Sequence, residues 1–151
     1  MGINAHPGQG VILLCDYSGF KAPEMVKKRP VVVLCRKDAR RYGVCTIVPL
    51  STSAPRTMLP YQPKIRMPVR LPPPFESEDC WVKADMINTV SYERLNHFRE
   101  MDATGRWVLM SPVIGSEIYS LIQASVTELL SLTAPDADHK FQGSVGVQTS
   151  A

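Results

Sequence analysis

Short apolar runs bounded by turn residues dominate the first third of the chain. The first covers residues 10–16 (GVILLCD), and two more follow at 30–35 (PVVVLC) and 43–49 (GVCTIVP). Nearly continuous apolar runs of this length predict strands that are buried on both faces. The basic linker at 36–42 is too short for a crossover helix, so we expect the second and third strands to pair antiparallel. The pattern indicates a β meander or a small barrel.

Prolines interrupt this pattern between residues 54 and 74. Seven of them occur there, at positions 55, 60, 63, 68, 72, 73 and 74. Because proline cannot donate a hydrogen bond to a strand ladder, this stretch can supply at most an edge strand, around residues 64–67, and is otherwise expected to be a loop. Further short strands are expected at 80–84 and 87–90, followed by a turn and a brief helix within 91–98.

The apolar spacing becomes helical towards the C-terminus. Residues 117–132 repeat apolar side chains at i, i+3, i+4, i+7 and i+8, which predicts one amphipathic helix. The expected buried face consists of Ile118, Leu121, Ile122, Ser125, Val126, Leu129 and Leu130. From residue 133 onward the chain is polar and small, which is typical of a flexible tail. We therefore expect a lead-in at 1–9, one domain at 10–132 and a tail at 133–151.

Composition narrows the possible classes of protein. A chain of 151 residues with 44% hydrophobic content can form one domain with a substantial core. The net charge of +3 permits an anionic partner such as RNA without requiring one. Residues 1–9 lack a secretory signal, and no apolar run approaches the roughly 20 residues of a membrane helix. A cytoplasmic, soluble protein with no membrane association is expected.

The cysteines give little sign of a metal or a disulfide framework. They are Cys15, Cys35, Cys45 and Cys80. They form no C-x-x-C pair, and three of them lie in apolar runs, so buried free thiols are favoured over a zinc site or disulfides. No metal and no cofactor are therefore expected.

Three local patterns occur in a fixed order: GVILLCD, then EMVKKRPVVVL, then VPLST. Together they resemble the MazF/PemK family of toxin endoribonucleases, in which a strand ending in an acidic residue precedes an R-P strand and a V-P-x-T/S-T/S strand end. The later CWVKADMINTV resembles the family's strand with a central aspartate. The similarity spans about residues 8–132, and it is the order and spacing of the motifs that make it specific.

The resemblance implies a mainly β fold with helices, an SH3-like barrel of the MazF/PemK/CcdB type with a C-terminal helix. It implies a homodimer that binds single-stranded RNA in the groove between its subunits. The implied activity is sequence-selective cleavage without a metal, in which the ribose 2′-hydroxyl attacks the neighbouring phosphate. It further implies the toxin of a type II toxin-antitoxin system, an mRNA interferase with a cognate acidic antitoxin.

Several residues match the family's catalytic positions. Arg29 matches the R-P arginine, whose guanidinium fork can hold a phosphate bidentately. Thr52, with Ser51 beside it, matches the hydroxyl pair expected on the scissile phosphate. Glu24 can be the general base or an anchor for its loop. Lys83 and Asp85 occupy the positions of a basic residue and an aspartate; lysine replaces the family's arginine, and the aspartate can be structural.

Basic and aromatic residues near these motifs are candidates for RNA binding. They are Lys27, Lys28, Arg56, Tyr61, Lys64 and Arg66. The last four lie in the proline-rich stretch, where basic residues interleaved with an aromatic suit phosphate contact and base stacking. A rigid, solvated loop is the alternative interpretation. His6, His97 and His139 match no position of the family.

Two other functions remain open. A toxin of the same fold could poison a protein target, although such relatives lack the combination of R-P and V-P-x-S/T-T. A non-catalytic SH3-like module that binds RNA or a protein is the second possibility, because Lys83 departs from the family pattern and a fold does not fix a function.

Overall fold

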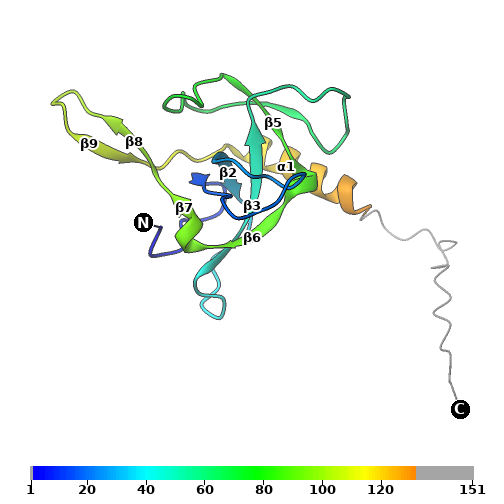
Figure 1. Cartoon of the computed structure of the whole chain (residues 1–151), viewed down its shortest axis with the longest axis horizontal. Coiled ribbons are helices and arrows are strands. Elements are labelled where there is room, and N and C mark those ends of the chain that lie inside the picture. Colours follow the sequence, from blue (N-terminus) through cyan, green and yellow to red (C-terminus); the bar gives the residue numbers. More distant parts are fainter. Residues whose placement is uncertain (1, 132–151) are drawn as a thin grey trace, which may run out of the picture.

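The computed structural model describes residues 2–131 and is mainly β (Figure 1). Its elements are β1 (Ile12–Cys15), β2 (Arg29–Val33), β3 (Val44–Ser51), β4 (Lys64–Arg66), β5 (Asp79–Val82), the 3-10 helix η1 (Ala84–Met86), β6 (Asn88–Ser91), the 3-10 helix η2 (Tyr92–Arg94), β7 (Leu95–Asn96), β8 (Phe98–Met101), β9 (Trp107–Met110) and α1 (Ser116–Leu130). Most strands and the single α-helix of the described part lie within a few residues of the expected ranges. The prediction of a mainly β protein with a C-terminal helix is confirmed.

A central antiparallel meander of β1, β2 and β3 forms the middle of the sheet. Ile12 pairs with Val32 on β2, and Val32 pairs with Val48 on β3. From Pro30 to Val33 every residue of β2 is buried, as the apolar run predicted. The antiparallel pairing expected from the short basic linker is confirmed.

The pairing of β3 changes along its length. Its first half, Val44–Ile47, pairs with β6, whereas Leu50 and Ser51 pair with β5. The resulting strand order is β4-β5-β3-β2-β1-β7, with β6 on β3, and the two end strands do not pair with each other. A closed barrel is therefore not confirmed. Strand β4 is only three residues long with Pro63 before it, and such an edge is poorly suited to accept a further strand.

The two faces of the meander bury separate clusters of side chains. One face carries Ile12, Val32, Val48 and Leu50 against α1 and the proline-rich segment. The other face carries Leu13, Val31, Val33 and Ile47 against the strand β6 and the residues that follow it. This alternation is the period of two that a strand buried on both faces requires.

The helix α1 buries a narrower stripe than the sequence predicted. Ile122 is fully buried and Ile118 and Val126 are packed against the core, but Leu121 is 42% exposed and Leu130 is 54% exposed. The predicted face was too wide because the side chains at its two margins, Leu121 and Leu130, remain open to solvent. None of the helices in the described part is long and apolar enough to cross a membrane.

A hairpin of β8 and β9 was not expected from the sequence. It projects away from the rest of the molecule in Figure 1, and its register pairs Phe98 with Met110 and Met101 with Trp107. The side chain of Asp102 stabilises the turn by accepting hydrogen bonds from the backbone of Thr104 (2.8 Å) and Arg106 (3.0 Å). Charged residues in this segment hid the strand pattern.

The proline-rich segment 54–74 forms part of the loops at the top of Figure 1 and contains the predicted edge strand β4. It is more closely packed than a solvated loop, since Leu71 is 1% exposed and Met67 is 8% exposed. The lead-in is also docked, because the backbone N–H of Ile3 donates to the carbonyl oxygens of Tyr92 and Leu95. The predicted tail at 133–151 lies outside the described residues.

Candidate active site

One end of the meander carries the strongest candidate, Arg29, and the strand end that leads to Thr52. Arg29 is the first residue of β2 and pairs with Cys15 on β1. Ser51 is the last residue of β3. The β2–β3 pairing ends at Val31 and Pro49, so Arg29 and Ser51 each lie two residues beyond the last pair, at the same end of the two strands. The R-P and V-P-L-S-T motifs therefore meet at one edge of the fold.

The guanidinium of Arg29 has unused hydrogen-bonding capacity. The residue is half-buried, and its Nε atom is buried without a partner among residues 2–131. The following Pro30 is buried in the strand, which fixes the direction in which the chain presents Arg29. Lys27 and Lys28 are exposed in the preceding loop. The half-buried guanidinium takes part in no ion pair among the described residues, so its charge is available for an anion from outside the chain.

The two hydroxyls at the end of β3 have different surroundings. Ser51 is buried, and its hydroxyl both donates to the Ser53 carbonyl and accepts from the Ser53 N–H, each at 3.2 Å. Thr52 is half-buried, and its hydroxyl forms no hydrogen bond within the described chain. Ser51 therefore shapes the turn, while Thr52 keeps a hydroxyl available for a ligand.

A buried amide that the sequence reasoning missed connects Lys83 and Asp85. Gln62 is 5% exposed, and its Oε1 accepts a hydrogen bond from Lys83 Nζ (3.1 Å). Its Nε2 donates to Asp85 Oδ1 (2.9 Å). Lys83 is half-buried next to the same strand end, because its backbone N–H donates to the Pro49 carbonyl (2.9 Å). Gln62 thus fixes both charged side chains at once.

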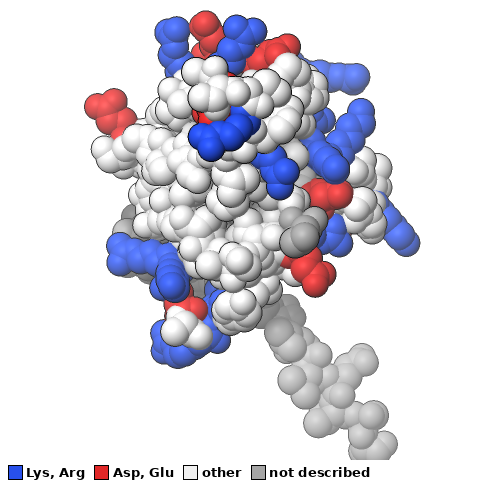
Figure 2. All heavy atoms as spheres, turned by 90° about the vertical axis from the view of Figure 1, so that its left-hand side faces the viewer, with Lys and Arg blue, Asp and Glu red and all other residues white. Residues whose placement is uncertain are grey.

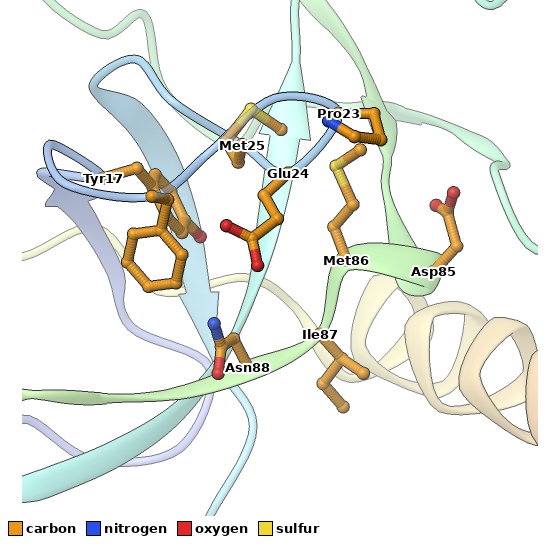
Figure 3. Close-up of a pocket in the computed structure, with 9 residues that line it drawn as sticks. Tyr17, Pro23, Glu24, Met25, Asp85, Met86, Ile87 and Asn88 are labelled. Carbon is orange, nitrogen blue, oxygen red and sulfur yellow. The ribbon is translucent and has the colours of Figure 1, made fainter.

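Glu24 and Asp85 line one cavity of about 410 Å³. In Figure 3 the carboxylate of Glu24 points towards Asn88, whereas Asp85 lies on the far side of Met86. Glu24 Oε2 accepts a hydrogen bond from the backbone N–H of Lys21 (2.7 Å). This hydrogen bond makes Glu24 an anchor for its loop, which is one of the two roles expected from the sequence. Its carboxylate also reaches the cavity, as the other role, that of general base, requires.

Two acidic or phenolic groups near this cavity have shifted pKa values. The backbone N–H of Ser18 donates to Asp16 at 2.9 Å and lowers the pKa of that carboxyl, with Lys28 acting in the same direction. Asp16 is the acidic residue that follows β1. Burial raises the pKa of Tyr17, which lines the cavity, so this phenol is neutral. Asp16 therefore remains an anion below the usual pH range of a carboxyl group.

The candidate RNA-binding residues are dispersed. Arg56 is exposed, and Tyr61 is half-buried and packs against the core. Lys64 and Arg66 on the edge strand β4 form ion pairs with Asp79 (3.5 Å) and Glu78 (3.3 Å). Figure 2 shows that basic side chains on the visible face form separate groups with acidic ones among them. An RNA that contacts β4 must compete with these exposed ion pairs, which are weak.

Trp81 is a second residue that the sequence reasoning missed. It is half-buried on β5, where it pairs with Ser51 on one side and with Lys64 on the other. Directly opposed residues of an antiparallel pair lie on the same face. The indole therefore lies next to the hydroxyl end of β3. The VPLST and CWVKA motifs suggested neighbouring strand ends, but not their register.

The expectation of free thiols is confirmed, since Cys15, Cys45 and Cys80 are buried and Cys35 is half-buried, all four without disulfides. Two of them are not isolated, however. Cys35 and Cys45 lie with His6 in a cluster whose ligand atoms are all within 4.8 Å of one another. This cluster is at the other end of β2 and β3 from Arg29.

Comparison with known proteins is consistent with this geometry. The chain matches the family of PemK-like, MazF-like toxins of type II toxin-antitoxin systems over residues 8–104. It is 32% identical over 118 residues to the putative uncharacterized protein YifN of Escherichia coli K12, covering 66% of this chain and 78% of that protein.

Two solved structures share the fold. The crystal structure of MazF from Deinococcus radiodurans superposes with a TM-score of 0.54 at 16% identity, covering 83% of this chain and 96% of that one. The Mycobacterium tuberculosis toxin MazF-mt6 gives a TM-score of 0.53 at 15% identity, with coverage of 82% and 99%. Because the family match extends over more than half of the sequence, the chain belongs to the PemK-like, MazF-like toxin family of type II toxin-antitoxin systems.

Proposed function

We propose that this toxin is an endoribonuclease that cleaves single-stranded RNA. The ribose 2′-hydroxyl attacks the adjacent phosphorus and the 5′-oxygen leaves, which gives a 2′,3′-cyclic phosphate and a free 5′-hydroxyl. Because RNA supplies its own nucleophile, the reaction does not require a metal-generated hydroxide. The proposal rests on the position of Arg29, whose Nε has no partner among the described residues, at the same end of β2 and β3 as the Ser51–Thr52 strand end.

Arg29 is proposed to hold the scissile phosphate. Charge accumulates on the non-bridging oxygens as the phosphorane forms, and a preorganised guanidinium stabilises that charge most when it is shielded from water. The half-buried position of Arg29 meets this condition. Thr52 adds a neutral hydrogen bond, and Lys83 adds a second positive charge held in place by Gln62.

Glu24 is proposed as the general base for the 2′-hydroxyl. It lies in the loop that leads to Arg29, and its carboxylate reaches the cavity of about 410 Å³. Its hydrogen bond to Lys21 uses Oε2, which leaves Oε1 for the substrate. Asp85 is then a positioning residue that acts through Gln62. Glu24→Gln should reduce the cleavage rate about 100-fold or more, the usual contribution of a general base, whereas Asp85→Asn should cost less.

The proposed RNA path crosses the strand ends next to Arg29. Lys27 and Lys28 lie before β2 and can contact the backbone, while Arg56, Lys64 and Arg66 extend the basic surface over the proline-rich segment. Tyr61 was an expected stacking residue, but its packing against the core leaves less of its ring free than the sequence suggested. Trp81 is better placed to stack on a base beside Ser51.

A homodimer and an acidic antitoxin are proposed as partners. Membership of a toxin-antitoxin family supports the antitoxin. Exposed apolar side chains on and near the β8–β9 hairpin support a protein interface, since Trp107 is 66% exposed, Leu109 59% and Val113 54%. Four free thiols fit a reducing cytoplasm. Light scattering should give a dimer; a monomer that is fully active at nanomolar concentration would contradict this part.

A single-atom change in the substrate tests the mechanism. An RNA oligonucleotide that is cleaved at one position is compared with the same oligonucleotide carrying a 2′-deoxy nucleotide on the 5′ side of that bond. Cleavage should stop at the substituted position alone, because the attacking hydroxyl has been removed. Continued cleavage there would mean that water or another group is the nucleophile. Failure to cleave any RNA would favour a toxin that acts on a protein or a non-catalytic binding module.

A further inference from the structure

Three potential metal ligands meet at the end of β2 and β3 opposite to Arg29. His6 Nε2 lies 3.3 Å from Cys35 Sγ and 3.8 Å from Cys45 Sγ. The two sulfur atoms are 3.8 Å apart. Cys35 follows β2 and Cys45 lies in β3, so the antiparallel register places them opposite each other. The lead-in brings the histidine over this pair.

These spacings are those of ligands around a tetrahedral zinc ion. With Zn–S of about 2.3 Å and Zn–N of about 2.0–2.1 Å, tetrahedral geometry separates two sulfur ligands by about 3.8 Å and a sulfur from a nitrogen by about 3.6 Å. The distance of 3.8 Å between the two sulfur atoms equals the expected separation of two sulfur ligands. The two distances from His6 Nε2 to sulfur, 3.3 and 3.8 Å, lie below and above the separation expected for nitrogen and sulfur. We propose that His6, Cys35 and Cys45 form a binding site for a thiophilic divalent cation of the zinc class.

A backbone hydrogen bond supports the ligating form of Cys35. The backbone N–H of Thr46 donates to Cys35 Sγ (3.2 Å), which supports a thiolate and orients it. The ion displaces the thiol protons when it binds, which makes its affinity depend on pH.

Metal binding releases two thiol protons and shifts the imidazole proton from Nε2 to Nδ1. In the metal-free arrangement Nδ1 accepts a hydrogen bond from the Gly8 N–H (3.1 Å), and this contact must give way. Gly8 has a φ of +101°, a conformation that glycine adopts without strain, and glycine also has the widest choice of other backbone conformations. Binding therefore couples to the conformation of the lead-in.

The fourth coordination position faces a cavity of about 430 Å³. Loop residues 36–41 line it together with His6, Cys35 and Val44. Asp38, the acidic residue of this loop, is already paired with Arg40 at 2.9 Å. Water is therefore the fourth ligand, as at zinc sites with three protein ligands. The site lies six strand residues, or about 20 Å, from Arg29, and has no part in the proposed cleavage.

Cobalt titration of the reduced, metal-free full chain tests this proposal. One Co²⁺ per chain should bind with thiolate-to-cobalt charge-transfer bands and the strong d–d bands of tetrahedral coordination, and Zn²⁺ should displace it. His6→Gln and Cys35→Ser alter half-buried side chains, and folding of each is checked by circular dichroism. Each should weaken binding at least about 100-fold, because even the loss of a group that orients a ligand costs 10- to 100-fold.

Cys80→Ala is the matched control, since Cys80 is a free thiol on β5 outside the cluster. It should retain the parent affinity, and zinc should raise the melting temperature of the parent and of this control but not of His6→Gln. Three results would overturn the proposal. The first is the absence of a sulfur-to-cobalt band in folded, reduced protein, and the second is an equal affinity for Co²⁺ in Cys35→Ser and in the control. The third is a Cys35–Cys45 disulfide that forms on oxidation while the reduced chain takes up no metal. None of these results bears on RNA cleavage, which is measured separately.

Discussion

Arg29→Ala separates the contribution of this residue to catalysis from its contribution to the fold. None of the ion pairs among residues 2–131 includes Arg29, and its buried Nε has no partner. Truncation therefore removes part of the packed side-chain stem and at the same time removes an unsatisfied donor. These two effects oppose each other, so we expect the free energy of unfolding to change by no more than about 1 kcal/mol.

The effect on cleavage should be much larger. Loss of one preorganised donor to a developing oxyanion costs about 10²- to 10³-fold in rate, equivalent to about 2.7–4 kcal/mol. Arg29→Lys retains the charge but loses the planar fork that can grip two phosphate oxygens. Its activity should remain well below that of the parent, which distinguishes a geometric requirement from a simple requirement for positive charge.

The assay is single-turnover cleavage of a labelled RNA oligonucleotide at saturating protein, with urea unfolding of each variant measured in parallel. Arg41→Ala is the matched control, because Arg41 is an exposed arginine in the loop at the opposite end of the strands. It removes the same charge and should leave the rate near that of the parent. If Arg29→Ala cleaves RNA as fast as Arg41→Ala does, the proposed site is wrong and the Lys83–Gln62–Asp85 group becomes the next candidate.

Three further predictions concern residues around this site and in the core. Thr52→Ala should slow cleavage only about 2- to 10-fold in the same assay, because it removes a neutral hydrogen bond worth about 0.5–1.5 kcal/mol; a loss as large as that of Arg29→Ala would refute this role. Gln62→Leu should lower the free energy of unfolding in urea by about 1–3 kcal/mol, since it removes hydrogen bonds to two charged groups; an unchanged value would contradict the bridge. Alkaline pH should destabilise the protein, because three thiols are buried. Burial raises the pKa of Cys15 and of Cys80 to about 11 and that of Cys45 to about 12, above the value of 9.0 for an exposed thiol. The native chain retains these protons after the unfolded chain has lost them, so stability is fully present below pH 9.0 and falls above it, by up to about 1.4 kcal/mol per pH unit for each thiol; a flat urea-unfolding profile across that pH would show that the thiols are accessible.

The apolar runs were sufficient to predict the central strands. Residues 30–33 and 47–49 are buried on both faces, so their pattern reports burial directly, and the short linker between the two strands favours the antiparallel pairing. The β8–β9 hairpin was missed because only one side of it contacts the core. Arg99, Glu100 and Arg106 are exposed there, and their charges mask the alternation.

The candidate site could be predicted only in part, because some of its contacts join segments that are far apart in the sequence. Gln62 reaches Lys83 and Asp85 only because β4 pairs with β5, and no local pattern in a proline-rich stretch encodes that pairing. The closeness of Cys35 and Cys45 could have been inferred from the expected hairpin, since the two flank its turn. The approach of His6 could not, because it depends on how the lead-in docks against β7 and η2.

We propose that this toxin cuts RNA with its own side chains and the 2′-hydroxyl of the substrate. The most direct measurement is incubation of the purified parent and of Arg29→Ala with a long single-stranded RNA in excess chelator, followed by analysis of the new ends. The parent should cleave the RNA and leave a 2′,3′-cyclic phosphate or 3′-phosphate on one side of each cut and a 5′-hydroxyl on the other. Arg29→Ala should not produce these ends. Cleavage that depends strictly on added Mg²⁺, or that leaves 5′-phosphate ends, would contradict this proposal.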